Sequence, residues 1–339
     1  MADARVRIGV VGAGFMGRTY AHLIHDHPAA ELAGVADVDA AAANAVAARY
    51  GCPAFSEAAA LVETGELHGL IVATVEDAHR SPCLAALDGG IGVLVEKPLA
   101  TTLEESQEIV AAAARSRTPL MVGHVLRFDA RYALLRDAVQ SGQIGDPAYV
   151  YARRHNGANA QDRLRGRCSL PLFLGVHDYD AVRWTLGREV VAVRADERRG
   201  LLAGQGYPIA DLVVAVLTFD DGTLATVEEG WILPAGHPAG FDQRLDVHGS
   251  RGLVELAGGH AGLTVTTGDG AAWPDTALWP TVHGRPMGAL ARQADHFIAC
   301  LRSGQEPLVT GDDGLAAVRI ALAVEEAART GATVELRTP

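Results

Sequence analysis

The residues of this chain best suited to proton transfer are a lysine and a histidine in two separate short motifs. Lys97 lies in Glu96-Lys97-Pro98, and His177 lies in GVHDYD at residues 175–180. Oxidation of an alcohol removes a hydride from carbon and a proton from oxygen, so a base must reach the hydroxyl. An imidazole suits that task because it titrates near neutrality, and a lysine cation beside it would acidify the hydroxyl. The reverse assignment, with Lys97 as the base, stays open because buried lysines lose their proton readily.

A glycine-rich fingerprint near the N-terminus predicts dinucleotide binding. A strand-like run, RVRIGVV at residues 5–11, leads into GAGFMG at residues 12–17, and a helical pattern follows. The first glycine permits a tight turn, the second lets backbone approach a pyrophosphate, and the third lets helix and strand pack closely. The expected cofactor contacts in this loop are Gly12, Gly14, Phe15, Met16 and Gly17.

The second expected strand ends in an acid that indicates which nicotinamide cofactor binds. Asp37 follows the apolar run at residues 31–36 and lies about 20 residues beyond Gly17. Its carboxylate could accept from both ribose hydroxyls and would repel a 2′-phosphate, so NAD is favoured over NADP. Residues 38–43 also hold no Arg or Lys for a phosphate. Alternatively, Asp37 only ends the strand and caps the next helix, a role that Asp39 could take instead.

Composition limits the class of protein. The chain has 339 residues, of which 49% are hydrophobic and 21% charged, and its formal net charge is −12. That charge argues against nucleic acid as a partner, because phosphate binding needs a basic surface. No apolar stretch approaches the ~18 residues of a membrane helix, and we see no secretory signal. The four cysteines form no C-x-x-C pair, so we expect reduced thiols in a cytoplasmic protein and no metal site.

Short apolar runs alternate with helical patterns in the first third of the chain. Strands are expected at residues 71–74, 92–96 and 120–123, and helices near 56–63, 79–88 and 103–115. This alternation predicts a doubly wound parallel sheet, which binds ligands at the carboxyl ends of its strands. Thr74, Glu96 and Lys97 fall at such ends and join the expected cofactor site.

The pattern changes near residue 123, so we predict one domain over residues 1–122 and a second over 123–339. A helix is expected at 130–139, strand pairs at 211–231 and 244–256, and two helices at 288–302 and 313–329. Consecutive hairpins predict an antiparallel sheet in the second domain.

Together these motifs resemble the Gfo/Idh/MocA family of glucose-fructose oxidoreductases and inositol dehydrogenases. The matching elements are GAGFMG at 12–17, Ala73-Thr74 with His79, EKPLA at 96–100, Arg127-Phe128-Asp129, SGQIGDP at 141–147 and GVHDYD at 175–180. The resemblance implies an α/β fold, with an N-terminal Rossmann domain and a C-terminal domain whose large, mostly antiparallel sheet forms homodimers or homotetramers. It implies an NAD(P)-dependent dehydrogenase or reductase that acts on a secondary alcohol of a sugar, polyol or related ring. It also adds His79 to the cofactor residues and places Lys97-Pro98 against the nicotinamide, where both peptides of Lys97 need a check for cis geometry.

One position departs from the family pattern. Inositol dehydrogenase-like members usually have an Asp four residues before the motif histidine, where it binds a substrate hydroxyl, but this chain has Phe173. Asp178 or a residue from another segment could replace that contact, and Asp180 could orient the site or form a simple salt bridge. An arginine-rich run, residues 153–167, reads as a loop that could cover the substrate, or as surface arginines paired with acids or with another subunit. The substrate-binding candidates are Phe173, Asp178, Asp180, His124, Arg127, Arg163 and Trp231.

Three functions remain open on the sequence. The first is an NAD-dependent oxidoreductase of a sugar, sugar derivative or cyclitol that uses Lys97 and His177. The second is a glycoside-processing enzyme that oxidises its substrate transiently with no net redox change. The third is a non-catalytic sensor that keeps the cofactor site; Phe173 keeps this hypothesis open, while the presence of both Lys97 and His177 disfavours it.

Overall fold

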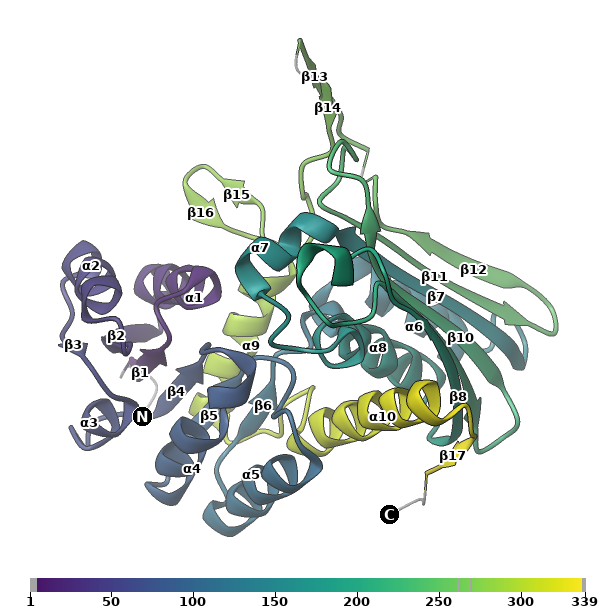
Figure 1. Cartoon of the computed structure of the whole chain (residues 1–339). Coiled ribbons are helices and arrows are strands. Elements are labelled where there is room, and N and C mark those ends of the chain that lie inside the picture. Colours follow the sequence, from purple (N-terminus) through teal and green to yellow (C-terminus); the bar gives the residue numbers. More distant parts are fainter. Residues whose placement is uncertain (1–4, 261, 269, 337–339) are drawn as a thin grey trace. The chain divides into compact units, whose positions relative to one another are not determined.

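The computed structural model describes residues 5–260, 262–268 and 270–336, and the chain divides into two compact units (Figure 1). The first unit joins residues 1–128 to 278–318, and the second joins 129–277 to 319–339. Each unit is therefore built from two separate stretches of chain, so the chain crosses between the units more than once. The boundary after residue 122 stays a prediction.

The first unit contains the predicted doubly wound sheet. Its six strands are all parallel and follow the order β3-β2-β1-β4-β5-β6, the arrangement of dinucleotide-binding sheets. The strands are β1 (Val6–Val11), β2 (Ala30–Ala36), β3 (Ala54–Phe55), β4 (Gly69–Val72), β5 (Gly92–Val95) and β6 (Leu120–Val122). Residues of β4, β5 and β6 are buried throughout, as expected for strands covered on both faces.

Two helices of the first unit begin at residues whose side chains cap the helix N-terminus. The helices of this unit are α1 (Phe15–Asp26), α2 (Ala40–Tyr50), α3 (Ala58–Val62), α4 (Arg80–Asp88), α5 (Leu103–Ser116) and α9 (Ala289–Ser303), with 3₁₀ turns η1 (Glu76–Ala78) and η2 (Val125–Phe128) and a small hairpin, β15 (Thr281–Val282) and β16 (Arg285–Pro286). Asp39 caps α2 by accepting from the backbone N–H groups of Ala41 and Ala42, and Thr102 caps α5. Leu301 of α9 packs so close to the sheet that a Cβ at Gly69 or Gly92 would lie 2.6 or 2.5 Å from it.

The second unit is a mixed sheet that is mostly antiparallel, as predicted. Its order is β12-β11-β7-β10-β9-β8-β17, and only the β7–β10 pair is parallel. The strands are β7 (Pro147–Gly157), β8 (Val190–Arg198), β9 (Leu212–Phe219), β10 (Leu224–Leu233), β11 (Phe241–Gly249), β12 (Leu253–Ala257) and β17 (Val334–Glu335), with a separate hairpin of β13 (Val265–Thr267) and β14 (Gly270–Ala272). Both predicted hairpins, β9–β10 and β11–β12, are present.

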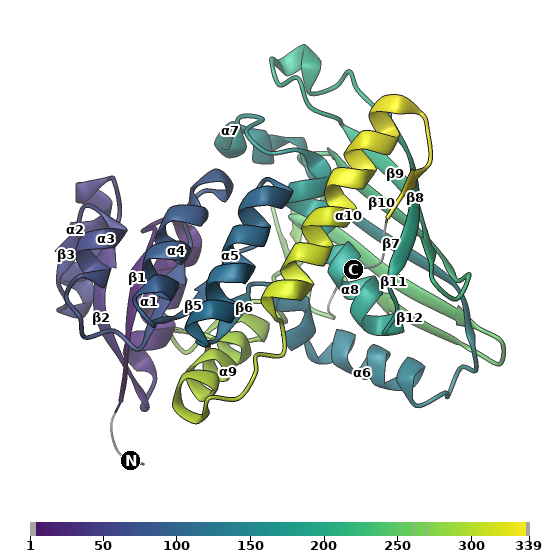
Figure 2. The ribbon, with the colours of Figure 1, turned by 90° about the horizontal axis from the view of Figure 1, so that it is seen from below.

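Helices cover one face of this sheet. These are α6 (Ala130–Gln140) and α8 (Val176–Leu186). The unit also contains the short α7 (Gln161–Leu164), a π-helical turn η4 (Pro171–Gly175) and the 3₁₀ turns η3 (Ala158–Ala160) and η5 (Ala203–Gln205). Figures 1 and 2 show α6 and α8 over the same face, and burial alternates strictly along β9 as a one-sided sheet requires. The long α10 (Gly311–Thr330) begins in the first unit and ends in the second. In the described part of the chain, no helix combines the length and apolarity needed to cross a bilayer.

Candidate active site

The glycine loop joins β1 to α1 in a conformation that two of its glycines require. Gly12 has a φ of +95°, and a Cβ there would lie 2.4 Å from the carbonyl oxygen of Ala73. A Cβ at Gly17 would lie 1.6 Å from the carbonyl oxygen of Gly12. Both glycines therefore hold the turn close to the neighbouring strand end and to the helix.

The remaining glycine leaves the start of α1 open. A Cβ at Gly14 would meet no atom within 4 Å, and no side chain caps the helix there. The space beside Gly14 at the start of this 12-residue helix is therefore open, and no side chain of the protein caps the first backbone N–H groups. This arrangement fits the pyrophosphate of a dinucleotide, because helix N-termini bind anions. Phe15 is 53% exposed at this end of the helix, and its ring meets that of Trp279 edge-on at 6.2 Å.

Asp37 follows β2 and holds the glycine loop from the side. Its Oδ2 accepts from the backbone N–H of Ala13 at 2.5 Å, and its Oδ1 accepts from the N–H of Asp39 at 2.8 Å. The structure gives the capping of α2 to Asp39, so Asp37 is not the helix cap. Its half-exposed carboxylate is thereby fixed beside the loop that the ribose role requires.

His79 fixes the segment that carries Lys97. Its side chain is 1% exposed, and its Nδ1 lies 2.8 Å from the carbonyl oxygen of Pro98. A carbonyl oxygen only accepts hydrogen bonds, so Nδ1 carries the proton. Burial lowers the pKa of the His79 imidazole. The Lys97-Pro98 peptide is cis. Thr74 lies nearby in sequence at the end of β4, half exposed, with its hydroxyl directed to the carbonyl of Val75 at 3.3 Å.

Glu96 takes part in a buried hydrogen-bond chain. The Tyr20 hydroxyl donates to Glu96 Oε1 at 2.8 Å, and Gln293 Nε2 donates to the Tyr20 oxygen at 2.6 Å. The second carboxylate oxygen lies 3.3 Å from the backbone N–H of Lys97. Burial raises the pKa of the Glu96 carboxyl, whereas the attraction of Lys97 and the Tyr20 hydrogen bond lower it. These contacts connect α1 and α9 to the residue immediately before Lys97.

In the second unit, His177 lies at the start of α8, directly after the π-helical turn η4. Along residues 170–182 the only partly exposed positions are Phe173 and His177, which are four residues apart. A π-helical turn is rare and often occurs at functional sites. The imidazole is therefore presented on the one accessible stripe of this segment.

The acids that flank His177 are buried rather than accessible. Asp178 and Asp180 are each 1% exposed. Both Asp178 oxygens accept from the Arg154 guanidinium, at 2.6 Å from Nε and 3.0 Å from Nη2, and Gln243 Oε1 accepts from Nη1 at 2.9 Å. This buried pair fastens α8 to β7 and favours a structural role for Asp178, whose substrate contact stays a prediction.

A buried acid and a buried indole lie beneath the π-helical turn. Glu229 and Trp231 of β10 are 0% exposed, and their alternate positions place both on the helix-covered face. Burial raises the pKa of Glu229 well above its usual value, and a Cβ at Gly175 would lie 2.3 Å from its Oε1. The rings of Phe173 and Trp231 lie 5.5 Å apart at 42°.

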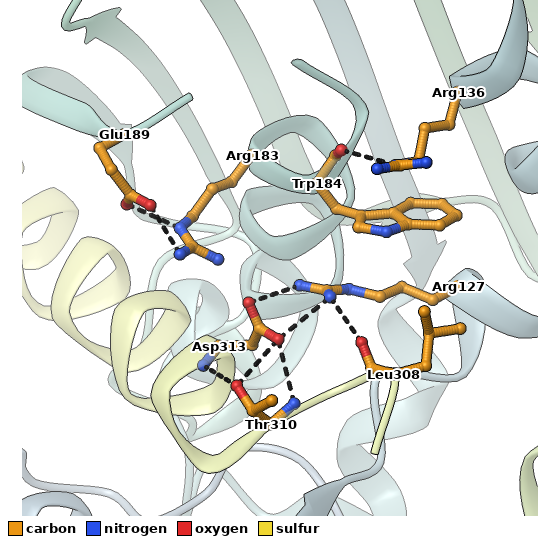
Figure 3. A network of polar contacts seen from close by, with 8 residues as sticks. All are labelled: Arg127, Arg136, Arg183, Trp184, Glu189, Leu308, Thr310 and Asp313. Carbon is orange, nitrogen blue, oxygen red and sulfur yellow. Dashed lines mark hydrogen bonds and ion pairs between the residues drawn. The ribbon is translucent and has the colours of Figure 1, made fainter. Parts of the chain in front are cut away.

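Two further candidates belong to the first unit and are buried. Figure 3 shows Arg127 donating to the carbonyl of Leu308 at 3.0 Å and to Asp313 Oδ2 at 3.1 Å; its side chain is 4% exposed. This ion pair fastens η2 to the start of α10. His124, before η2, is 1% exposed. Their predicted substrate roles stay untested, and the ion pair favours a structural role for Arg127.

The arginine-rich run differs from the loop that we expected. Residues 153–157 belong to strand β7, and a 3₁₀ turn and helix α7 follow. Arg153 pairs with Asp242 of β11 at 2.6 Å, and Arg154 is the buried partner of Asp178. For residues 153–157 the loop interpretation was wrong, because they continue strand β7. The ion pairs of Arg153 and Arg154 agree with the alternative of arginines paired with acids, and a role of the run in covering the substrate stays a prediction. Arg163 lies in α7, but its side chain is outside the part of the chain that the structure describes.

Tyr20, Gln293 and Glu229 were not among the predicted site residues, yet Tyr20 and Gln293 form the hydrogen-bond chain to Glu96, and Glu229 lies against the π-helical turn before His177. For Glu229 a signal exists, since it occupies an inward position of β10 in the same register as Ala225 and Val227. An acid in the apolar register of a strand indicates a special environment. Tyr20 and Gln293 lie on helical faces that read as ordinary core. Within the described residues, no group of three His, Cys, Asp or Glu side chains could hold a metal ion.

Comparison with known proteins supports one family across the chain. A model of the Gfo/Idh/MocA oxidoreductase family, NAD-binding Rossmann fold, matches residues 6–124, and a model of its C-terminal alpha/beta domain matches residues 136–336. The chain is 29% identical to inositol 2-dehydrogenase of Rhizobium meliloti (strain 1021), over 93% of this chain and 94% of that protein. It is 31% identical to inositol 2-dehydrogenase 2 of Saccharopolyspora erythraea, over 97% and 94%.

A solved structure shares the fold over the full length. Scyllo-inositol dehydrogenase from Lactobacillus casei, with bound NAD(H) and scyllo-inositol, superposes with a TM-score of 0.83 and covers 98% of this chain and 99% of that one. At 21% identity this likeness concerns the fold alone. The open helix N-terminus at Gly14, the carboxylate of Asp37 and the N-terminal family model agree on NAD as the cofactor. The chain belongs to the Gfo/Idh/MocA family of NAD-dependent oxidoreductases.

Proposed function

We propose that this chain transfers a hydride between NAD and a secondary alcohol or ketone of a sugar, sugar derivative or cyclitol, with Lys97 and His177 as its proton-handling residues. The observation that carries the proposal is the clamped Lys97 segment at the carboxyl end of β5. Glu96 before it accepts from Tyr20 at 2.8 Å, and the Pro98 carbonyl after it lies 2.8 Å from His79. Two inositol dehydrogenases that this chain matches over more than nine-tenths of its length support the substrate class.

The residues of the chain divide the chemistry between them. NAD, when bound, supplies the hydride acceptor. Gly14 and the open N-terminus of α1 would hold its pyrophosphate, and Asp37 would hold a ribose and disfavour a 2′-phosphate.

Proton transfer needs a second set of residues. Lys97 presents a cation next to the Glu96 carboxylate, which attracts it, and a cation near the carbinol stabilises the developing alkoxide. His177, partly exposed at the start of α8, accepts the proton from the hydroxyl. In the reverse assignment, Lys97 accepts the proton from the hydroxyl.

The proposal includes the setting of the enzyme. Four free cysteines support a cytoplasmic location. The face of the second sheet opposite α6 and α8 carries half-exposed apolar residues of β9, including Val214 and Val216, and supports a homodimer or homotetramer through this sheet. Size-exclusion chromatography with light scattering tests the oligomer, and a monomer at micromolar concentration would refute it.

The activity is tested with a panel of polyols, sugars, uronic acids and glycosides, each with NAD and with NADP. The wild type is expected to reduce NAD with at least one polyol or sugar, and Lys97→Ala to lose activity by about 10²- to 10⁴-fold. Product formation from a glycoside without net change in nicotinamide absorbance would instead indicate transient oxidation. Tight NAD binding without turnover of any compound would indicate a sensor.

A further inference from the structure

The accessible face around His177 is aromatic rather than polar. Phe173 is the only other partly exposed residue along 170–182, and it lies four residues before His177. Phe173 lies in the π-helical turn that runs directly into α8, and His177 is the second residue of α8, so about one turn of the helix separates the two side chains. A ligand group that reaches the imidazole along this face therefore lies beside the Phe173 ring.

The Phe173 ring has a rigid support. Trp231 is 0% exposed, and its ring lies 5.5 Å from that of Phe173 at an angle of 42°. Trp231 projects from β10, a central strand of the sheet, on the side that α8 covers. A ring packed against a buried indole keeps its orientation, so Phe173 forms a fixed wall.

The acids near this wall are withdrawn from the accessible face. Asp178 is committed to Arg154 at 2.6 Å, and Asp180 is 1% exposed. Glu229 beneath the turn is 0% exposed. A hydroxyl placed against the Phe173 ring would lose its water and find no carboxylate of this segment as a partner, which disfavours it.

We propose that Phe173, supported by Trp231, selects sugar or cyclitol derivatives with an apolar group close to the reacting carbinol. In such a derivative, a hydrogen or a methyl ether replaces one hydroxyl group. The replaced hydroxyl is on the ring carbon next to the carbinol carbon, or on the ring carbon after that one. This inference rests on the proposed function, because it takes His177 as the residue that contacts the carbinol. It makes the enzyme a dehydrogenase of deoxy or O-methylated rings rather than of fully hydroxylated ones.

The test compares matched ligands and matched variants. myo-Inositol and glucose are each assayed with their complete sets of monodeoxy and mono-O-methyl analogues, using wild type, Phe173→Leu and Phe173→Asp. The wild type is expected to prefer at least one analogue over its parent by about 10- to 100-fold in kcat/KM, the range by which an apolar pocket rejects an added hydroxyl. Phe173→Leu keeps that preference because it stays apolar, whereas Phe173→Asp reverses it by accepting a hydrogen bond.

Several outcomes would overturn the inference. Equal or better turnover of both parents by the wild type would do so, since the ring would then only stack on the C–H face of the substrate. An unchanged ratio of kcat/KM for analogue over parent in Phe173→Asp would also overturn it. If the melting temperature of Phe173→Asp shows that it is misfolded, Phe173→Asn takes its place.

Failure of the proposed function can be distinguished from failure of this inference. If the wild type oxidises no compound, calorimetry on the NADH-loaded protein measures the binding of each parent and analogue directly. Tighter binding of an analogue, lost in Phe173→Asp, supports the apolar wall although the redox proposal has failed. Equal binding, or no binding of any member, overturns the wall as well.

Discussion

The hydroxyl of Tyr20 offers a sharp perturbation of the Lys97 segment. Tyr20→Phe removes one oxygen from a side chain that is 0% exposed. That oxygen donates to Glu96 at 2.8 Å and accepts from Gln293 at 2.6 Å. The ring and its packing stay, so the change tests the hydrogen-bond chain alone.

The expected cost follows from the two bonds. A hydrogen bond to a charged group contributes about 1.5–3 kcal/mol, and a buried donor left without its partner costs about 1–3 kcal/mol. Gln293 Oε1 already has no hydrogen-bond partner among the described residues, so its amide cannot compensate by turning. We expect Tyr20→Phe to lower the free energy of unfolding by about 3–5 kcal/mol at a pH where Glu96 is ionised.

The cost depends on pH in a defined direction. Burial raises the folded-state pKa of Glu96, so the folded protein binds this proton more tightly than the unfolded chain does. Ionisation of Glu96 therefore removes stability as the pH rises from the usual carboxyl range through the folded pKa. Because the Tyr20 bond lowers that pKa, its loss raises the pKa further, and the deficit is larger at pH 8 than at pH 5.

Unfolding in urea at pH 5 and pH 8, with kcat measured against pH, checks this prediction. The acidic limb of the kcat profile is expected to move to higher pH in Tyr20→Phe, since ionised Glu96 supports the Lys97 cation. Tyr132→Phe is the matched control. Tyr132 is equally buried, but its hydroxyl oxygen accepts only a long hydrogen bond, at 3.5 Å from Arg154 Nη2, so the variant loses less hydrogen bonding. A deficit of the same size at both pH values, or an unmoved kcat profile, would refute the reasoning.

Three further predictions test the cofactor site and the support of α8. Asp37→Ser is expected to lower the preference for NAD over NADP at least tenfold by removing the negative charge beside the ribose, as the two kcat/KM values show; an unchanged ratio would refute the role. Gly14→Ala is expected to fold normally but weaken NAD binding in calorimetry, whereas Gly17→Ala, whose Cβ would lie 1.6 Å from a loop carbonyl, is expected to lose soluble expression. Equal behaviour of the two glycine variants would contradict this distinction. Arg154→Ala leaves the buried Asp178 carboxylate unpaired and is expected to cost about 3–5 kcal/mol in urea unfolding, with Arg154→Ala/Asp178→Asn partly restored. A double variant no more stable than the single one would count against the pairing.

Local patterns predicted most of the regular elements. The apolar runs before Gly12, Asp37 and Thr74 are strands because each is short, apolar and followed by a turn or polar residue. The helical patterns between these runs predicted that the strands are parallel, as the structure has them. The tight turn at residues 220–223 likewise predicted the β9–β10 hairpin, which the structure contains.

Features that depend on distant partners were not predictable in this way. The run at Arg153 and Arg154 reads as exposed, yet it continues a strand, because Asp242 and Asp178 neutralise it from β11 and α8. The π-helical turn before His177 lies against the carboxylate of Glu229 in β10, and the sequence of the turn itself gives no indication of this partner. The return of residues 278–318 to the first unit depends on packing such as Leu301 against Gly69.

Single-turnover hydride transfer tests the central claim most directly. The best substrate of the panel, in protonated form and deuterated at the carbinol carbon, is mixed with NAD-loaded wild type, Lys97→Ala and His177→Ala. The account predicts NAD reduction by the wild type with a primary isotope effect, and a rate about 10²- to 10⁴-fold lower in each variant while NAD binding is unchanged. Transfer at the wild-type rate in either variant, or no reduction of NAD by any panel compound, would contradict it.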